Sequence, residues 1–195
     1  MFNLVSEFES QIAEFFGAPY AVATDSCTHA LELCLRYTKY NNITIPTRTY
    51  ISVPMTFEKL GLNWSWREEE WSDYYHLGNT NIIDAAVLWG ENTYLANTFM
   101  CLSFQFKKHL NLGRGGMILL QNKSDFDSLK KMSYDGRDLS RSWTEQDIDT
   151  IGYHYYMTPE VAKFGIELLN ERKKIPGKKW SHRDYPNLTQ MTVFK

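Results

Sequence analysis

The sequence predicts an α/β fold in which helices flank a mainly parallel central sheet. Helical and strand-like patterns alternate along the 195 residues, and several strand-like stretches are short, continuous apolar runs. Strands that alternate with helices are typical of parallel sheets, because each helix carries the chain back to begin the next strand in the same direction. We expect residues 1–175 to form one large domain and residues 176–195, which are polar and aperiodic, to form a C-terminal arm or tail.

The helices are predicted from apolar residues at helical spacing. The first spans residues 6–17, with Phe8 and Ile12 on its apolar face. Ser6 and Glu9 have the spacing of a capping box at the start of this helix. Further helices are expected over residues 27–40, 52–61, 124–132 and 158–174.

The strand candidates lie between these helices and are short and mostly apolar. They cover residues 20–24, 43–46, 62–66, 81–86, 100–104 and 115–121. Residues 67–80 are the most linker-like stretch, because they carry several charges and no clear period.

Composition excludes several classes of protein. The net charge of -2 gives no broad electrostatic attraction to nucleic acid or to an anionic membrane, and no apolar run is long enough to span a bilayer. The N-terminal stretch carries acids where a signal peptide has basic residues. No metal site is expected, because the five histidines lie at no short ligand spacing. The three cysteines form no C-x-x-C pair and favour a reducing cytoplasm: Cys27, Cys34 and Cys101.

Residues that could bind a ligand follow the first two strand candidates. In open α/β sheets, ligands bind beyond the carboxyl ends of the strands. Cys27 and Thr28 begin a helix after the first strand, where free amides suit a phosphate, although an ordinary helix cap also explains such residues. Tyr50 follows the second strand and could either stack on a flat ligand or pack in the core.

Two later strand ends carry a carboxylate and lysines. Asp84 ends a buried strand and requires a partner, which could be a structural arginine or a ligand cation. Ser103 precedes Lys107 and Lys108, although most lysines are simply solvated. A phosphate cradle, a stacking ring, a carboxylate and a lysine are together the groups that pyridoxal phosphate requires.

Five stretches in order resemble motifs of the DegT/DnrJ/EryC1/StrS sugar aminotransferases, which are fold-type-I pyridoxal-phosphate enzymes. They are FESQIAEFFGAPYAVATDSCTHALELCL, IPTRTYIS, IIDAA, SFQFKKHLNLGRGGMILL and IGYHYYMTPEVAKFGIELLNER. The resemblance runs from about Phe8 to about Lys174 and therefore covers most of the chain. It implies the large domain of a fold-type-I aminotransferase.

The resemblance assigns the Schiff-base lysine to Lys108. The family lysine lies five residues after a serine and five before a glycine, and Ser103, Lys108 and Gly113 have both spacings. Lys107 has neither.

The resemblance also assigns the cofactor contacts. Asp84 would hold the pyridinium nitrogen, and Tyr50 would stack on the ring. Ser103 would bind the phosphate near Cys27 and Thr28. His154 stands in the segment that reaches the cofactor phosphate of a neighbouring subunit, which implies a homodimer with shared active sites.

Several positions depart from the family pattern. Val87 replaces a usual His or Gln, Arg114 a Glu, His154 an Asn and Tyr156 an Arg. Residues 67–80 are too few for a further strand–helix unit, and we expect a reduced form without the C-terminal small domain. The site could then be covered by residues 176–195, by a larger oligomer or by a partner chain.

The resemblance implies a ping-pong aminotransferase that acts between an amino acid and a keto sugar linked to a nucleotide. Two other functions stay open. One is different amino-acid chemistry on the same cofactor, such as racemisation. The other is a non-catalytic protein that binds the cofactor or a sugar on the same fold.

Overall fold

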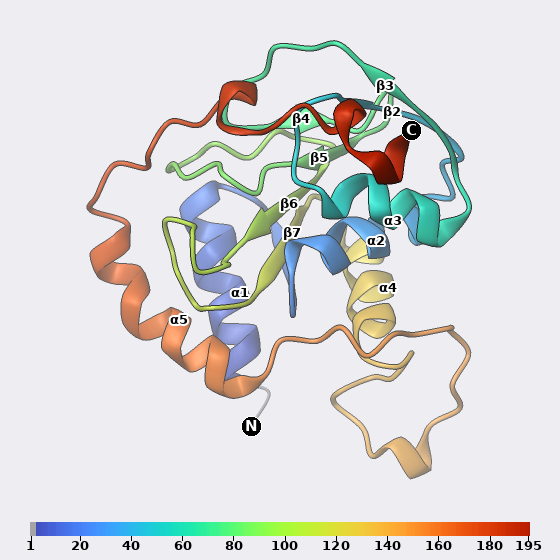
Figure 1. Ribbon diagram of the computed structural model, residues 1–195. Coiled ribbons are helices and arrows are strands. Elements are labelled where there is room, and N and C mark those ends of the chain that lie inside the picture. The colour runs from blue at the N-terminus through green and yellow to red at the C-terminus, as the bar shows by residue number, and fades with distance from the viewer. Residues whose placement is uncertain (1–2) are drawn as a thin grey trace.

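The computed structural model describes residues 3–195 and contains two sheets with helices on both sides (Figure 1). The larger sheet has the strand order β1 (Tyr20–Thr24), β7 (Gly116–Leu120), β6 (Phe99–Ser103), β5 (Ile82–Asp84) and β4 (Tyr75–His76). The smaller sheet pairs β2 (Asn42–Pro46) with β3 (Asn63–Arg67) in parallel, and α3 (Ser52–Leu60) connects the two strands.

The prediction of a mainly parallel sheet is wrong. In the larger sheet β7 runs antiparallel to both β1 and β6, β4 runs antiparallel to β5, and only β5 and β6 pair in parallel. The reason is the connections: β6 returns to β7 through the loop 104–115, and β4 returns to β5 through the turn 77–81. Neither contains a crossover helix, and strands joined without one pair antiparallel.

Strands β1, β5 and β6 nevertheless run in the same direction, because two antiparallel pairings with β7 restore the direction of β1 in β6. Their carboxyl ends therefore lie at the same edge of the sheet. These are the strand ends that precede most of the predicted site residues.

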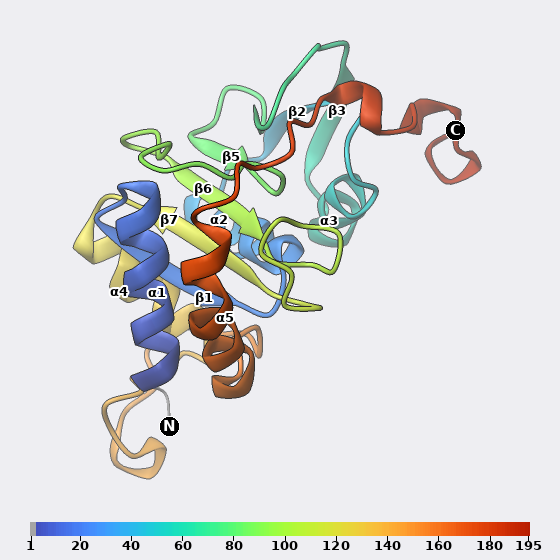
Figure 2. The ribbon, with the colours of Figure 1, turned by 90° about the vertical axis from the view of Figure 1, so that its left-hand side faces the viewer.

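Helices cover both faces of the larger sheet. α1 (Asn3–Phe16) and α5 (Pro159–Arg172) lie side by side on one face, as Figure 2 shows, whereas α2 (Cys27–Thr38) and α4 (Lys123–Ser133) cover the other. Strand β7 shows how the core divides. Ile118 and Leu120 belong to the apolar cluster beneath α2, and Met117 and Leu119 to the cluster beneath α1 and α5.

The predicted capping box at Ser6 and Glu9 is wrong. Helix α1 already includes Asn3, so Ser6 lies inside it. The Glu9 carboxylate is buried, accepts a hydrogen bond of 2.7 Å from the amide of Ala23 and pairs with Lys130. Tertiary partners therefore take the place of the local motif.

The expectation that residues 67–80 are too few for a strand–helix unit is confirmed. Between β3 and β5 the chain forms only the two-residue strand β4 and no helix. Within residues 3–195, no helix is long and apolar enough to cross a membrane.

The C-terminal segment, residues 176–195, packs against earlier residues of the same chain. Figure 1 shows it in red, passing from α5 over the end of the sheet towards β2 and β3. Backbone bridges join Ser181 to Ser72 and Asn187 to Arg48. Short 3-10 helices occur at Trp143–Glu145, His182–Asp184, Leu188–Gln190 and Thr192–Phe194.

We predict that Lys130→Met lowers the free energy of unfolding by about 3 kcal/mol at pH 7, because it leaves the buried Glu9 carboxylate without its cation. Burial raises the pKa of Glu9, and Lys130 opposes this rise. A raised carboxyl pKa favours the folded state only while the group is protonated, so the loss should be smaller at pH 5 than at pH 7.

Urea denaturation of the parent and variant at both pH values measures this difference. Lys123→Met is the matched control, because Lys123 and Asp127 form an exposed pair worth less than about 1 kcal/mol. An equal loss in the two variants, or no dependence on pH, would contradict the prediction.

Candidate active site

A cavity of about 430 Å³ opens at the carboxyl ends of β1, β5 and β6, beside the start of α2. Such strand ends are where ligands bind in open α/β sheets. The structure brings six of the seven predicted site residues into the lining of this one cavity: Cys27, Thr28, Tyr50, Asp84, Ser103 and Lys108.

The start of α2 provides an anion cradle. Ser26 caps the helix, and its hydroxyl oxygen accepts a hydrogen bond of 3.2 Å from the amide of His29. The amides of the first turn, including those of Cys27 and Thr28, have no partner within the helix and form the positive end of its dipole. The hydroxyls of Thr28 and Ser52 lie 2.7 Å apart at the same wall. This arrangement suits a phosphate.

Gly116 allows strand β7 to approach the cradle. A Cβ atom at this position would lie 2.4 Å from the carbonyl carbon of Ser26 and 2.5 Å from the nitrogen of Cys27. Any side chain here would therefore push the strand away from the helix start. Gly116 pairs with Ser103 across β6 and β7, so the close approach also sets the position of Ser103.

The Cys27 thiol is buried and lies 3.5 Å from the carbonyl oxygen of Cys101, to which it donates. Burial raises the pKa of this thiol well above its usual range, and Asp84 adds to the rise. Cys27 therefore remains a neutral thiol. Its contribution to anion binding is its backbone amide.

Asp84 is 6% exposed and holds two hydrogen bonds. Its Oδ2 accepts from the Tyr75 hydroxyl at 2.6 Å, and its Oδ1 accepts from the amide of Ala86 at 3.0 Å. Burial raises the pKa of Asp84, while these bonds and the charge of Lys108 oppose the rise. Within residues 3–195 no basic side chain lies within 4.0 Å of its oxygens. The carboxylate is thus held in place and can accept a ligand cation.

Tyr75 is a site residue that sequence reasoning missed. It lies directly opposite Asp84 in the β4–β5 pair, and it also hydrogen-bonds the hydroxyl of Thr49. Residues 67–80 were expected to be a linker, so Tyr75 had no assigned strand. An aromatic residue shortly before the IID strand was the available signal.

Lys108 follows a tight turn after β6, where its amide donates to the carbonyl of Gln105 at 2.8 Å. Burial lowers the pKa of Lys108, and the charge of Asp84 opposes this effect. Lys107 does not line the cavity, and its ammonium instead lies 5.7 Å from the ring centre of the exposed Phe106. The geometry therefore distinguishes the two lysines as the sequence spacing does.

Tyr50 forms an open wall of the cavity. Its side chain is 45% exposed, and its hydroxyl accepts a weak hydrogen bond of 3.4 Å from the Gln105 amide group. Part of its ring surface is therefore available to a flat ligand. Val87, by contrast, is buried in the core and offers no polar group.

Arg114 lies at the rim of the cavity and has a local partner. Its Nη2 donates to the Asp25 carboxylate at 2.7 Å, and its Nε donates to the Asp25 carbonyl at 3.2 Å. Asp25 also pairs with His29 at 2.6 Å. The reversed charge at position 114 is therefore balanced at the rim itself.

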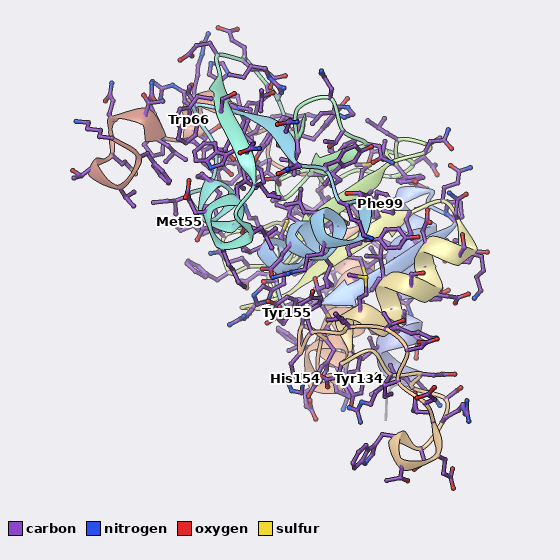
Figure 3. All side chains as sticks on the ribbon, turned by 90° about the vertical axis from the view of Figure 1, so that its right-hand side faces the viewer. Met55, Trp66, Phe99, Tyr134, His154 and Tyr155 are labelled. Atoms are coloured by element: carbon purple, nitrogen blue, oxygen red, sulfur yellow. The ribbon has the colours of Figure 1, made fainter. Side chains whose placement is uncertain are left out.

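His154 lies outside the cavity of its own chain. Its imidazole is exposed and pairs with Asp135 at 3.1 Å. Figure 3 shows His154 next to Tyr134, whereas Tyr155 lies nearer α2, where its ring stacks on His29 at 3.6 Å. A contact of His154 with the site of a second chain stays a prediction.

The cavity fits pyridoxal phosphate. The start of α2 can hold its phosphate, Tyr50 its ring face, Asp84 its pyridine nitrogen and Lys108 its aldehyde. Within residues 3–195 no group of three or more His, Cys, Asp or Glu side chains could hold a metal ion.

The sequence model of the DegT/DnrJ/EryC1/StrS aminotransferase family matches residues 1–64 and 90–182, which is most of the chain. The chain belongs to this family. The two matched stretches contain every predicted site residue except Asp84, which lies between them. A comparison with curated protein sequences finds no match.

Solved structures show the same fold at low identity. The sugar aminotransferase CalS13 from Micromonospora echinospora matches with a TM-score of 0.73 at 14% identity, covering 88% of this chain and 61% of that one. The putative sugar aminotransferase Spr1654 from Streptococcus pneumoniae, in its PLP form, gives 0.73 at 17%, covering 88% and 60%. AtS13 from Actinomadura melliaura gives 0.75 at 18%, covering 88% and 60%. The chain thus spans about 60% of the length of these proteins.

We predict that Gly116→Ala weakens pyridoxal phosphate binding about tenfold, a loss of roughly 1.4 kcal/mol, because the new Cβ displaces the helix start. Titration followed by absorbance measures the affinity. Gly61→Ala is the control, since Gly61 ends α3 at φ +63° with no atom within 4 Å of an added Cβ. It should cost about 1 kcal/mol of stability but leave the affinity unchanged. Equal affinities in all three proteins would disprove the assignment of the cradle.

Proposed function

We propose that this chain binds pyridoxal phosphate through Lys108 and transfers an amino group between an amino acid and a keto sugar linked to a nucleotide. The observation that carries the proposal is the placement of Lys108 and the buried Asp84 in one cavity beside the start of α2. Membership of the aminotransferase family supports it. Similar solved structures, which include sugar aminotransferases and DesI in the presence of its TDP-sugar product, support the substrate class.

Bound pyridoxal phosphate would supply an electron sink for the carbanion that amino transfer requires. Lys108 Nζ would attach the cofactor and then, as a free amine, take up and return the proton at the reacting carbon. Burial lowers the pKa of Lys108, so more of the free amine is present near neutral pH than for a solvated lysine.

Asp84 would hold the proton on the pyridine nitrogen. Tyr75 and the amide of Ala86 already fix both of its carboxylate oxygens, so little reorganisation is needed when a ligand binds. The amides at the start of α2, with Thr28 and Ser103, would hold the phosphate. Tyr50 would stack on the cofactor ring and hold its orientation.

We also propose a homodimer in which His154 completes the site of the partner chain. His154 is exposed and does not line its own cavity. The stretch of chain that leads to His154 carries two exposed apolar side chains, Trp143 at 64% and Ile151 at 81%, which suits an interface better than open water.

We expect pyridoxal phosphate to give a yellow protein in which borohydride fixes the cofactor on Lys108. Absorbance and peptide mapping by mass spectrometry follow the adduct. Lys107→Ala is the matched control and should react like the parent, whereas Lys108→Ala should lose the adduct. A cofactor fixed on Lys107, or on no lysine, would falsify the attachment.

Mixed dimers test the shared site. Lys108→Ala and His154→Ala chains, each impaired alone, should regain part of the activity when they are mixed and exchange subunits. Each heterodimer contains two sites, and both residues are intact in one of them. A heterodimer can therefore regain up to half of the activity of the parent dimer. Mass spectrometry verifies that the subunits have exchanged. If no activity returns after exchange, or if a monomer is fully active, the site is built from one chain.

A further inference from the structure

The C-terminal segment places an aromatic ring beside the candidate Schiff-base lysine. The Lys108 ammonium lies 5.6 Å from the centre of the Trp180 indole. Lys178 lies 3.8 Å from the same ring. The Trp180 side chain is half-buried and packs against the apolar cluster beneath α2. The indole is thus part of the packed structure and lies next to Lys108, which lines the cavity.

Backbone and side-chain bonds fix the position of Trp180. The amide of Asp73 donates to the Trp180 carbonyl at 2.9 Å, and the Trp180 amide donates to Asp73 Oδ1 at 3.1 Å. Lys179 pairs with the other carboxylate oxygen of Asp73 at 2.9 Å. Two residues later, the amide of His182 donates to the carbonyl of Trp71 at 3.1 Å. Segment 180–182 is therefore held against residues 71–73.

The same segment supports the residue that binds Asp84. The Tyr185 ring lies 5.4 Å from that of Trp71, which lies 5.2 Å from Tyr75, the hydrogen-bond donor to Asp84. Arg48 donates to the Tyr185 carbonyl at 2.9 Å and so ties this part of the segment to the loop before Tyr50. The segment therefore contacts both sides of the candidate site.

We propose that Trp180 is a positioning residue for Lys108: residues 178–185 hold the indole against the lysine side chain and keep its amine in the cavity, away from bulk water. The catalytic meaning of this contact rests on the proposed function. The contact itself does not, because it is a feature of the fold.

The effect of the ring on Lys108 follows from the groups around the amine. Asp84 favours the charged amine and Lys107 disfavours it, while the neutral Cys27 thiol adds no charge. At 5.6 Å the indole is near the limit of about 6 Å for a cation–π interaction, so its attraction for the ammonium is weak. Its larger effect is to exclude water, and burial is the main cause of the lowered pKa of Lys108.

The test is trace labelling of the ligand-free protein with acetic anhydride across a range of pH, with the label on Lys108 resolved by peptide mass spectrometry. The pH profile gives the pKa of Lys108, and its plateau at high pH gives the accessibility of the amine. In Trp180→Ala we expect the midpoint to rise by about half a unit, which lowers the fraction of free amine about threefold at a pH below the midpoint. We also expect the plateau rate at high pH to increase, because the amine is then more accessible to the reagent.

Trp180→Phe keeps an aromatic ring and should stay near the parent. Phe164→Ala is the matched control, because Phe164 is 46% exposed on α5 and does not line the cavity. Asp73→Gly removes the carboxylate that holds the segment, tolerates the φ of +62° at this position and should shift the Lys108 profile in the same direction as Trp180→Ala. It provides the test if Trp180→Ala does not fold, as judged by circular dichroism.

Lys108 profiles of Trp180→Ala and Asp73→Gly that match the parent overturn the proposal, as does an equal shift in Phe164→Ala. The labelling needs no cofactor, so its outcome is independent of the borohydride experiment. Failure of cofactor attachment with a clear effect of Trp180 would reject the proposed function and leave the shielding in place. The opposite pair of results would reject the shielding alone.

Discussion

The burial of the Asp84 carboxylate is the constraint on which the rest of the site depends. A carboxylate that is only 6% exposed must be hydrogen-bonded if it is to remain charged. The amide of Ala86 comes from the residues that follow β5, but the second partner, Tyr75, comes from β4. This two-residue strand therefore has a chemical role as well as a place in the sheet. Asp84 can still pair with a ligand cation, because no basic side chain of residues 3–195 forms an ion pair with it.

The phosphate side of the cavity depends on a second constraint, the close approach of a strand to a helix start. Gly116 lets β7 pass beside Ser26 and Cys27, so the free amides of α2 and the hydroxyl of Ser103 open into one space. Because β1, β5 and β6 share a direction, the carboxylate and the lysine reach the same edge. The antiparallel strand β7 lies between two of these strands without disturbing that convergence.

The chain belongs to the DegT/DnrJ/EryC1/StrS aminotransferase family and spans about 60% of the length of the solved structures that it resembles. Its C-terminal segment packs along the edge of the site, where Trp180 lies beside Lys108 and Tyr185 supports the Trp71–Tyr75 pair. The candidate cofactor site is thus enclosed in part by residues of the same chain. Arg114, paired with Asp25, gives the rim a balanced charge at a position where the family pattern has an acid.

Sequence alone predicted most helices and strands, because periodicity is a property of neighbouring residues. Its resemblance to the family motif favoured Lys108 over Lys107. It also placed Cys27, Thr28, Tyr50, Asp84 and Ser103 at strand ends, and these residues do line one cavity. Only the tertiary structure decided the direction of β7 and β4, the partners of Glu9, the hydrogen bond from Tyr75 to Asp84 and the contact of Trp180 with Lys108. Each of these joins separate elements of the chain. These contacts are stabilised by burial and pairing between residues that are distant in the sequence, so no local pattern reveals them.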